Sequence, residues 1–169
     1  MNLILRHSIR FVFLLLFQTM VLNQLEIGWG IQIMVYPIFL FLLPFELSVS
    51  LILLISFAMG LLIDSISNTY GLHTSALVMM AYFRPIIFKA FAPRDGYDPL
   101  KEGTIYDMGG AWFFSTFGIL LVIHHFWFFL IEMFRLDALL FVLQKTILSF
   151  AISLVFCLLL QMLFIRKNK

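Results

Sequence analysis

Residues 47–63 read LSVSLILLISFAMGLLI, a run that contains no charged side chain. Apolar residues follow one another continuously instead of alternating with polar ones, which favours a helix in an apolar environment over a strand of a membrane barrel. A helix needs about 20 such residues to cross the hydrocarbon core of a bilayer, and slightly shorter runs are tolerated. This stretch therefore predicts a membrane-spanning helix.

The rest of the chain has the same character. Of its 169 residues, 63% are hydrophobic and only 12% are charged, and the mean hydropathy is +1.05. Soluble domains carry about 25% charged residues, so a soluble globule of this composition would expose large apolar patches. The 21 Phe residues also exclude a disordered chain, since disordered segments are poor in aromatic residues. We expect residues 1–169 to form one all-α integral membrane domain.

Six apolar stretches are candidates for membrane spans. They cover residues 8–25, 31–43, 47–63, 72–91, 111–131 and 138–165. The second stretch is short and carries Pro37 in its middle, so we expect its helix to be kinked or partly broken there. The first resembles a signal peptide, but no cleavage site of small residues follows it, and we expect it to be retained as a span.

The distribution of Lys and Arg predicts the orientation of these spans. With six spans and the N-terminus inside, the outer connections contain only Arg135 of these basic residues. The inner side receives Arg6, Arg10, Lys89, Arg94, Lys101, Arg166, Lys167 and Lys169. Basic residues concentrate on the cytoplasmic side, so both termini and residues 92–110 are expected there. The net charge of +2 is too small to suggest nucleic acid as a partner.

Small and polar residues form a stripe on the third predicted helix. Ser56, Gly60 and Asp64 recur every four residues and therefore lie on one face. Small side chains on such a face allow a neighbouring helix to approach closely. Asp64 ends the stripe where the chain leaves the membrane. It either anchors the following turn or a partner chain, or simply meets water at the helix end, and the sequence leaves both interpretations open.

Two basic residues, Arg84 and Lys145, fall within predicted spans. Their long side chains can extend towards the lipid headgroups. Alternatively, Arg84 forms an intramembrane pair with Glu46, which precedes the third helix on the same side of the membrane. A charge inside a bilayer without a partner is costly, by about 2.5–3.5 kcal/mol on insertion scales, which favours such a pair.

No residue pattern in the sequence indicates catalysis. Cys157 is the only cysteine, which excludes an internal disulfide and a metal cluster held by cysteines. His124 and His125 are adjacent, so a helix turns them about 100° apart and they cannot both face one metal ion. Phosphate-binding loops, HExxH and GxSxG motifs and paired carboxylates are missing from the sequence. We expect no enzymatic activity, no cofactor and no metal.

One part of the sequence resembles a known family. Residues 57–64 read FAMGLLID, Gly71 follows after a short polar turn, and the next span ends in MAYFR at residues 80–84. This pattern resembles the bacterial rod shape-determining protein MreD family, and the chain length, the number of spans and the proline of the second span also fit. Ser56, Gly60, Asp64 and Gly71 are accordingly the candidate helix-packing or partner-binding residues.

The resemblance implies a function outside catalysis. Members of that family are inner-membrane subunits of the cell-elongation machinery that builds peptidoglycan. The implied partners are MreC, the MreB filament, the pair of RodA with its transpeptidase, and membrane lipid.

The implied fold also resembles the six-helix substrate-binding component of energy-coupling-factor vitamin transporters, which is the alternative function. Those components look as if they dock their energising module through an A-x-x-x-A pattern on the first helix. Residues 11–22 of this chain read FVFLLLFQTMVL and contain neither Ala nor Gly. A close-packed docking face is therefore missing from the first span, which favours the cell-shape interpretation.

Overall fold

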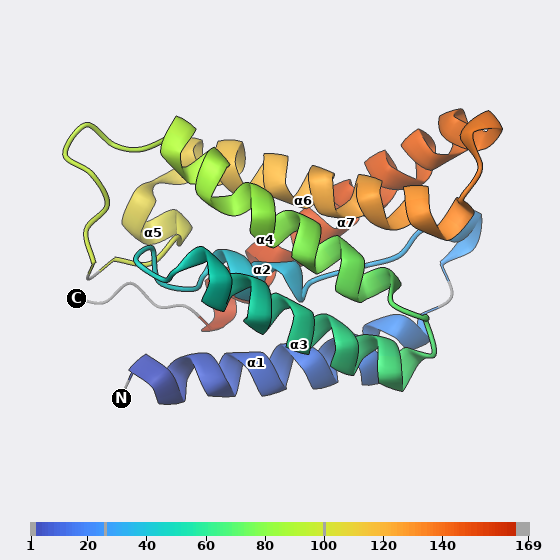
Figure 1. The fold of residues 1–169 in the computed structure, drawn as a ribbon, viewed down its shortest axis with the longest axis horizontal. Helices are drawn as coiled ribbons and strands as arrows, with labels where there is room; N and C mark the ends of the chain where they lie inside the picture. Colours follow the sequence, from blue (N-terminus) through green and yellow to red (C-terminus); the bar gives the residue numbers. More distant parts are fainter. Residues whose placement is uncertain (1–2, 26, 100, 165–169) are drawn as a thin grey trace.

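The structure, a computed structural model, describes residues 3–25, 27–99 and 101–164. Five long helices run the length of the molecule (Figure 1). They are α1 (Leu3–Met20), α3 (Val49–Ser67), α4 (Leu72–Ala90), α6 (Gly110–Met133) and α7 (Leu139–Phe164). Strand pairing within the described residues is limited to one isolated bridge. The predicted all-α class is therefore confirmed.

Four of these segments are long and apolar enough to cross a membrane, which is the property expected of a membrane protein. They are Leu3–Gln24, Val49–Ser67, Gly110–Met133 and Leu139–Leu163. Helix α4 is not among them. Its 19 residues are interrupted by the polar and charged side chains of His73, Arg84 and Lys89. The prediction of six membrane-spanning helices is thus supported for four of them.

Both chain ends of the described bundle lie at the same end of the molecule (Figure 1). We call this the loop end, because residues 91–109 and the short helix α5 (Ile105–Met108) also lie there. The opposite end holds residues 68–71 between α3 and α4, and we call it the turn end. The connection from α6 to α7, with the short turn η3 (Leu136–Ala138), lies at the turn end as well.

The prediction of a helix over residues 31–43 is wrong. After α1 the chain forms two short turns, η1 (Leu22–Gln24) and η2 (Gly28–Gly30), and then an extended stretch. Only α2 (Pro37–Phe41) is helical within the predicted span. Pro37 occupies the first turn of α2, where its missing N–H costs nothing, and so it begins this helix instead of interrupting a longer one.

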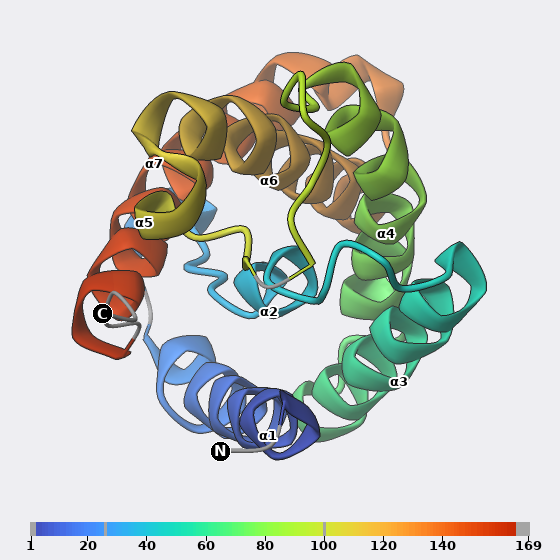
Figure 2. The ribbon, with the colours of Figure 1, turned by 90° about the vertical axis from the view of Figure 1, so that its left-hand side faces the viewer.

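Figure 2 shows why residues 31–43 are apolar on all sides. The five long helices form a ring, and α2 lies inside it. Every side chain from 33 to 43 is buried. A segment surrounded by protein needs no polar face, which makes it look like a membrane span in the sequence. We call residues 31–43 the central segment.

Candidate functional site

Helices α3 and α4 approach each other most closely at Gly60. A Cβ atom built on Gly60 would lie 2.8 Å from the backbone nitrogen of Thr74 and 3.2 Å from the carbonyl carbon of His73. Both neighbours belong to the backbone of α4, which cannot move aside as a flexible side chain can. Ser56, one turn earlier, is also buried, and its hydroxyl donates to the carbonyl of Leu53 at 2.8 Å. The structure thus places the stripe of small residues against α4.

Asp64 continues this contact at the turn end. One carboxylate oxygen accepts hydrogen bonds from Thr69 Oγ1 at 2.6 Å and from the backbone N–H of His73 at 3.0 Å. The other accepts from the backbone N–H of Thr74 at 2.8 Å and from its hydroxyl at 2.5 Å. The first N–H groups of a helix have no intrahelical acceptor and favour a nearby negative charge. Asp64 therefore anchors the turn and caps α4.

Gly71 completes the turn. It precedes α4 as its N-cap residue and has a φ of +93°, a conformation that costs glycine little and other residues more. Its side of the turn is open, since a Cβ atom there would meet no atom within 4 Å. The requirement at this position is therefore one of backbone conformation, whereas the requirement at Gly60 is one of space.

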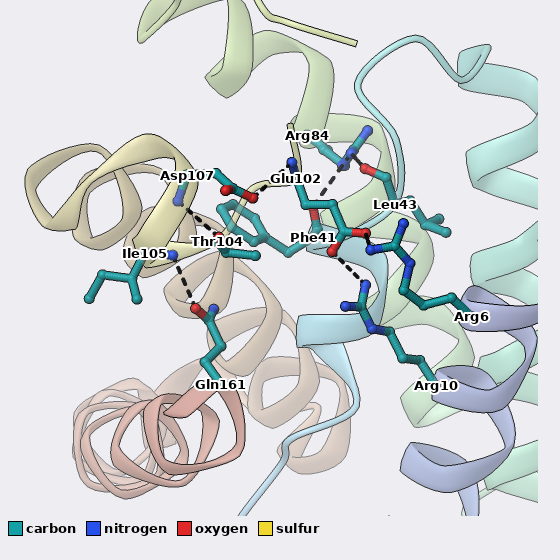
Figure 3. Close-up of polar contacts among 10 residues, drawn as sticks. All are labelled: Arg6, Arg10, Phe41, Leu43, Arg84, Glu102, Thr104, Ile105, Asp107 and Gln161. Carbon is teal, nitrogen blue, oxygen red and sulfur yellow. Dashed lines mark hydrogen bonds and ion pairs between the residues drawn. The ribbon is translucent and has the colours of Figure 1, made fainter. Parts of the chain in front are cut away.

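Arg84 is 2% exposed, and its partners differ from the one predicted (Figure 3). Its Nη2 donates to the carbonyl oxygens of Leu43 at 2.5 Å and Pro44 at 3.3 Å, just beyond α2. The predicted ion pair with Glu46 is not present in the described part of the chain. The last carbonyls of a helix lack intrahelical donors and favour a positive charge. The C-terminal side of α2 therefore binds this guanidinium.

Lys145 is also buried, so it does not extend towards headgroups. Its Nζ lies 2.5 Å from Glu132 Oε2 and 4.7 Å from the ring centroid of Phe129. Glu132 accepts a second hydrogen bond, at 3.2 Å, from the side-chain amide of Gln32. The pair thus joins α6, α7 and the central segment near the turn end.

The extended part of the central segment is hydrogen-bonded by serines of α7. The backbone N–H of Gln32 donates to Ser149 Oγ at 3.0 Å, and the N–H of Met34 donates to Ser153 Oγ at 2.9 Å. Ser149 and Ser153 are four residues apart and so lie on one face of α7. Their spacing matches alternate N–H groups of an extended chain that runs beside the helix.

Gln18 of α1 binds the same segment from the other side. Its Oε1 accepts from the backbone N–H of Val35 at 2.9 Å, and its Nε2 donates to the carbonyl of Ile33 at 2.9 Å. Non-helical backbone at membrane depth is tolerated only where other groups satisfy its N–H and C=O groups. Gln18 and the two serines supply those groups, and neither their role nor their partners could be recognised in the sequence.

A buried chain of aromatic and imidazole groups lies deeper in the ring. The hydroxyl of Tyr36 is 2.7 Å from His73 Nδ1 and 2.9 Å from His124 Nε2. A hydroxyl carries one proton, so Tyr36 donates to one of these rings and accepts from the other. His125 turns away, as predicted, and its Nε2 lies 3.1 Å from Ser153 Oγ. The described residues contain no group of three side chains suited to a metal ion.

A cavity opens above this chain at the turn end. Its volume is about 350 Å³, and most of its wall is formed by Leu22, Asn23, Leu25, Ile27 and residues 30–33. Ser67, Thr69 and His73 complete the wall from the α3–α4 side. The cavity therefore reaches a histidine whose Nδ1 is bound to Tyr36 and through it to His124.

The loop end is closed by a charged contact (Figure 3). Glu102, in the loop before α5, lies between two arginines of α1. Its carboxylate is 3.0 Å from Arg6 Nη1 and 2.7 Å from Arg10 Nη1. Since the arginines are four residues apart on α1, one carboxylate contacts both, and the loop is tied to α1.

Helix α5 is tied to α7 in the same region. The backbone N–H of Ile105 donates to Gln161 Oε1 at 3.1 Å, while Thr104 Oγ1 caps α5 by accepting from the N–H of Asp107 at 3.0 Å. Asp107 in turn accepts from the N–H of Glu102 at 3.2 Å. Residues 102–107 therefore bridge α1 and α7 across the loop end (Figure 3).

No protein-family model, curated protein or solved structure matches this sequence. Most of the polar side chains described above hold the central segment, the helix ends and the loop in place. This arrangement builds a ring of helices around a buried, partly extended segment.

Proposed function

We propose that the chain is a non-enzymatic subunit of the bacterial inner membrane that scaffolds partner proteins of the cell-elongation machinery. Two lines support the proposal. One is the resemblance of residues 57–84 to the MreD family. The other is that most of the buried polar side chains bond to groups of the chain itself, while the outward faces of the long helices are apolar. The apolar exterior is the structural observation on which the proposal rests.

The apolar exterior belongs mainly to α1, α3 and α7. Only 22% of the most apolar window of Leu3–Gln24, 33% of that of Val49–Ser67 and 28% of that of Leu139–Leu163 is buried. The outward-facing side chains include Ile4, Val12, Met20, Leu54, Leu61, Leu140, Ile147 and Leu163. In a bilayer such faces contact lipid or the helices of other proteins, and helices associate there through close packing.

The proposed partners are MreC, MreB and the pair of RodA with its transpeptidase, together with membrane lipid. Affinity purification of the full chain in mild detergent, with identification of the co-purifying proteins, tests this proposal. We expect MreC and a transpeptidase to co-purify. If MreC and the transpeptidase are abundant in the cells but do not co-purify with the chain, the proposed function is contradicted.

The turn-end cavity favours the alternative, a substrate-binding component of an energy-coupling-factor vitamin transporter. A cavity of about 350 Å³ that ends on His73 is large enough to hold a small molecule. The same purification separates the two functions, because a transporter component would bring down a pair of ATPases. The first helix argues against that result, since it offers no small residues for close docking.

A further inference from the structure

The turn-end cavity borders a ring nitrogen that no other group of the described chain binds. His73 lines the cavity and is 2% exposed. Its Nδ1 is bound to the hydroxyl of Tyr36, whereas its Nε2 forms no hydrogen bond within residues 3–25, 27–99 and 101–164. Nε2 is nevertheless not one of the enclosed unpaired atoms of those residues, so it touches accessible space. Because the cavity is the space that His73 lines, this nitrogen faces the cavity.

The histidine at the other end of the hydrogen-bonded chain determines where the protons lie. His124 is fully buried, its Nε2 binds Tyr36, and its Nδ1 is enclosed without a partner among the described residues. A charged imidazolium is disfavoured in such an interior, so the ring carries one proton. A buried N–H group without an acceptor is rarer in native proteins than an unpaired acceptor. The proton of His124 is therefore assigned to Nε2, which donates it to the oxygen of Tyr36.

This assignment makes Nε2 of His73 a donor. Tyr36 accepts from His124, and so it donates its single hydroxyl proton to Nδ1 of His73. Since Nδ1 of His73 accepts, the proton of that ring lies on Nε2, the nitrogen that faces the cavity. The wall of the cavity therefore offers an N–H group that has no acceptor in the described part of the chain, and a ligand supplies one when it carries an acceptor.

Other groups of the wall complement this donor. Ser67 Oγ accepts from Asn23 Nδ2 at 2.7 Å, which leaves its own hydroxyl proton for a ligand. Thr69 Oγ1 donates to Asp64 at 2.6 Å, so its lone pairs remain for a ligand. An amide group, with a carbonyl oxygen beside an N–H, matches both kinds of wall group. The apolar part of the wall consists of Leu22, Leu25, Ile27, Ile31 and Ile33.

The charges around the cavity favour an uncharged ligand. The described residues of the wall carry no charge. Directly behind the wall, the carboxylate of Asp64 accepts from Thr69 and from the backbone N–H of His73. The ion pairs among the described residues give Asp64 no basic partner. An anion in the cavity is therefore repelled, while a cation meets the N–H of His73 where it needs an acceptor.

We propose that the turn-end cavity binds a small uncharged molecule through an amide group whose carbonyl oxygen accepts a hydrogen bond from His73 Nε2. The apolar body of this ligand packs against Leu22, Ile31 and Ile33. A volume of about 350 Å³ is within the range of small-molecule sites. The inference goes beyond the scaffolding function and does not rest on it. Ligand binding is measured on the chain without its partners, so failure of this proposal and failure of the proposed function are separate results.

Three probes with the same ring test the ligand class. Para-fluorobenzamide is uncharged, para-fluorobenzoate is anionic and para-fluorobenzylamine is cationic at neutral pH. Fluorine NMR follows their binding to the purified full chain in detergent, with protein-free micelles as the blank. We expect saturable binding of the amide at one site per chain, and binding of both charged probes that is weaker by about tenfold or more. Lack of saturable amide binding, or a charged probe that binds as tightly as the amide, would overturn the proposal.

Two variants of His73 separate the roles of its ring nitrogens. His73→Gln places an amide N–H near the position of Nε2 and keeps the donor, whereas His73→Asn reaches only the position of Nδ1 and removes it. We expect His73→Gln to keep the affinity for para-fluorobenzamide and His73→Asn to weaken it about fivefold, as loss of one neutral hydrogen bond does. Equal affinities of the two variants would contradict the assignment of His73 as the donor.

Filling the cavity tests where the ligand lies. Ser67→Phe puts a ring into the cavity and should abolish binding of para-fluorobenzamide. Ser65→Phe is the matched control, because Ser65 lies on the same helix but is exposed and is not part of the cavity wall. If Ser67→Phe accumulates and binds the probe as well as Ser65→Phe does, the ligand does not occupy this cavity. If Ser67→Phe fails to accumulate, the two His73 variants decide the question.

Discussion

Gly60 and Asp64 show how single residues determine the α3–α4 contact. Gly60 is required because the backbone of Thr74 occupies the space where a side chain would begin. Asp64 is required because four donors from the turn and from the start of α4 converge on its two oxygens. The first is a matter of volume and the second of hydrogen bonding, so the two residues call for different tests.

At Gly60 we expect size to decide the result. Gly60→Leu should prevent the chain from accumulating, and Gly60→Ala should lower the free energy of unfolding by about 1–3 kcal/mol, as overpacking does. Leu61→Ala, at a side chain that is 49% exposed, should be nearly silent. Protein level and thermal stability in detergent measure both effects. A fully stable Gly60→Ala chain would show that α3 and α4 are farther apart than described.

At Asp64 we expect charge to decide. Asp64→Asn keeps the shape but leaves one acceptor oxygen for four donors, and hydrogen bonds to a charged group are worth about 1.5–3 kcal/mol. Thermal unfolding in detergent should show a loss of that order. Asp137→Asn is the matched control. Asp137 is exposed, and the hydrogen bond from Arg135 holds the pKa of this carboxyl below its usual value without anchoring another element.

At Arg84 we expect the loss of a charged donor to decide the result. Arg84→Gln should destabilise the protein by about 1.5–3 kcal/mol, because the carbonyls of Leu43 and Pro44 lose their charged donor. Glu46→Gln, at an exposed side chain, should change stability by less than about 0.5 kcal/mol. Equal losses of stability in the two variants, with no further loss in the double variant, would show that Glu46 and Arg84 form an ion pair after all.

At the scale of elements, the central segment is the distinctive part of the fold. It is non-helical over residues 31–35 and helical only from Pro37 to Phe41, with Tyr36 in a turn between the two parts. A helix satisfies its own backbone, whereas an extended stretch inside a bundle depends on its neighbours. The hydrogen bonds to this stretch come from Ser149 and Ser153 of α7 and from Gln18 of α1. The two helices make few direct contacts with each other, because they bind the segment from different sides.

This dependence gives an element-scale prediction. Ser153→Ala leaves the N–H of Met34 without its acceptor and removes the partner of His125 Nε2. A buried unsatisfied donor costs about 1–3 kcal/mol, so thermal stability should fall accordingly. Ser65→Ala should have little effect, because that serine is exposed and bonds only the carbonyl of Leu61 in its own helix. Similar losses for both serines would contradict the role of Ser153.

At the scale of the whole molecule, the loop end and the turn end divide the chain. Residues 102–107 bridge α1 and α7 at the loop end, where the chain also begins, and the α3–α4 turn lies at the other end (Figures 1 and 3). The Lys and Arg distribution predicts that the loop end is cytoplasmic. The two ends should therefore lie on opposite sides of the membrane.

Cysteine labelling measures this topology. After replacement of Cys157, a cysteine at the exposed Tyr70 should react with an impermeant reagent applied to intact cells. A cysteine at position 98 should react only after the membrane has been opened. Labelling of position 98 but not of position 70 in intact cells would show that the orientation is opposite to the predicted one. Labelling of both positions would show that the two ends are not separated by the membrane.

The sequence alone determined the features that depend on local order along the chain. Continuous apolar runs predicted the class and the position of the long helices, with ends shifted by a few residues. A period of four residues placed Ser56, Gly60 and Asp64 on one face. The polar turn before Gly71 ended α3 and began α4. Each of these signals lies within a few turns of helix, so no knowledge of distant neighbours is needed to recognise it.

The tertiary structure alone decided the path of the central segment and the partners of its polar groups. Residues 31–43 are as apolar as a membrane span, because burial among protein helices and burial in lipid select the same side chains. The N–H of Met34 and the hydroxyl of Ser153 are 119 positions apart, and Arg84 meets the carbonyl of Leu43 across 41 positions. Backbone groups carry no side-chain signature, so only the packed ring shows which polar residue satisfies them.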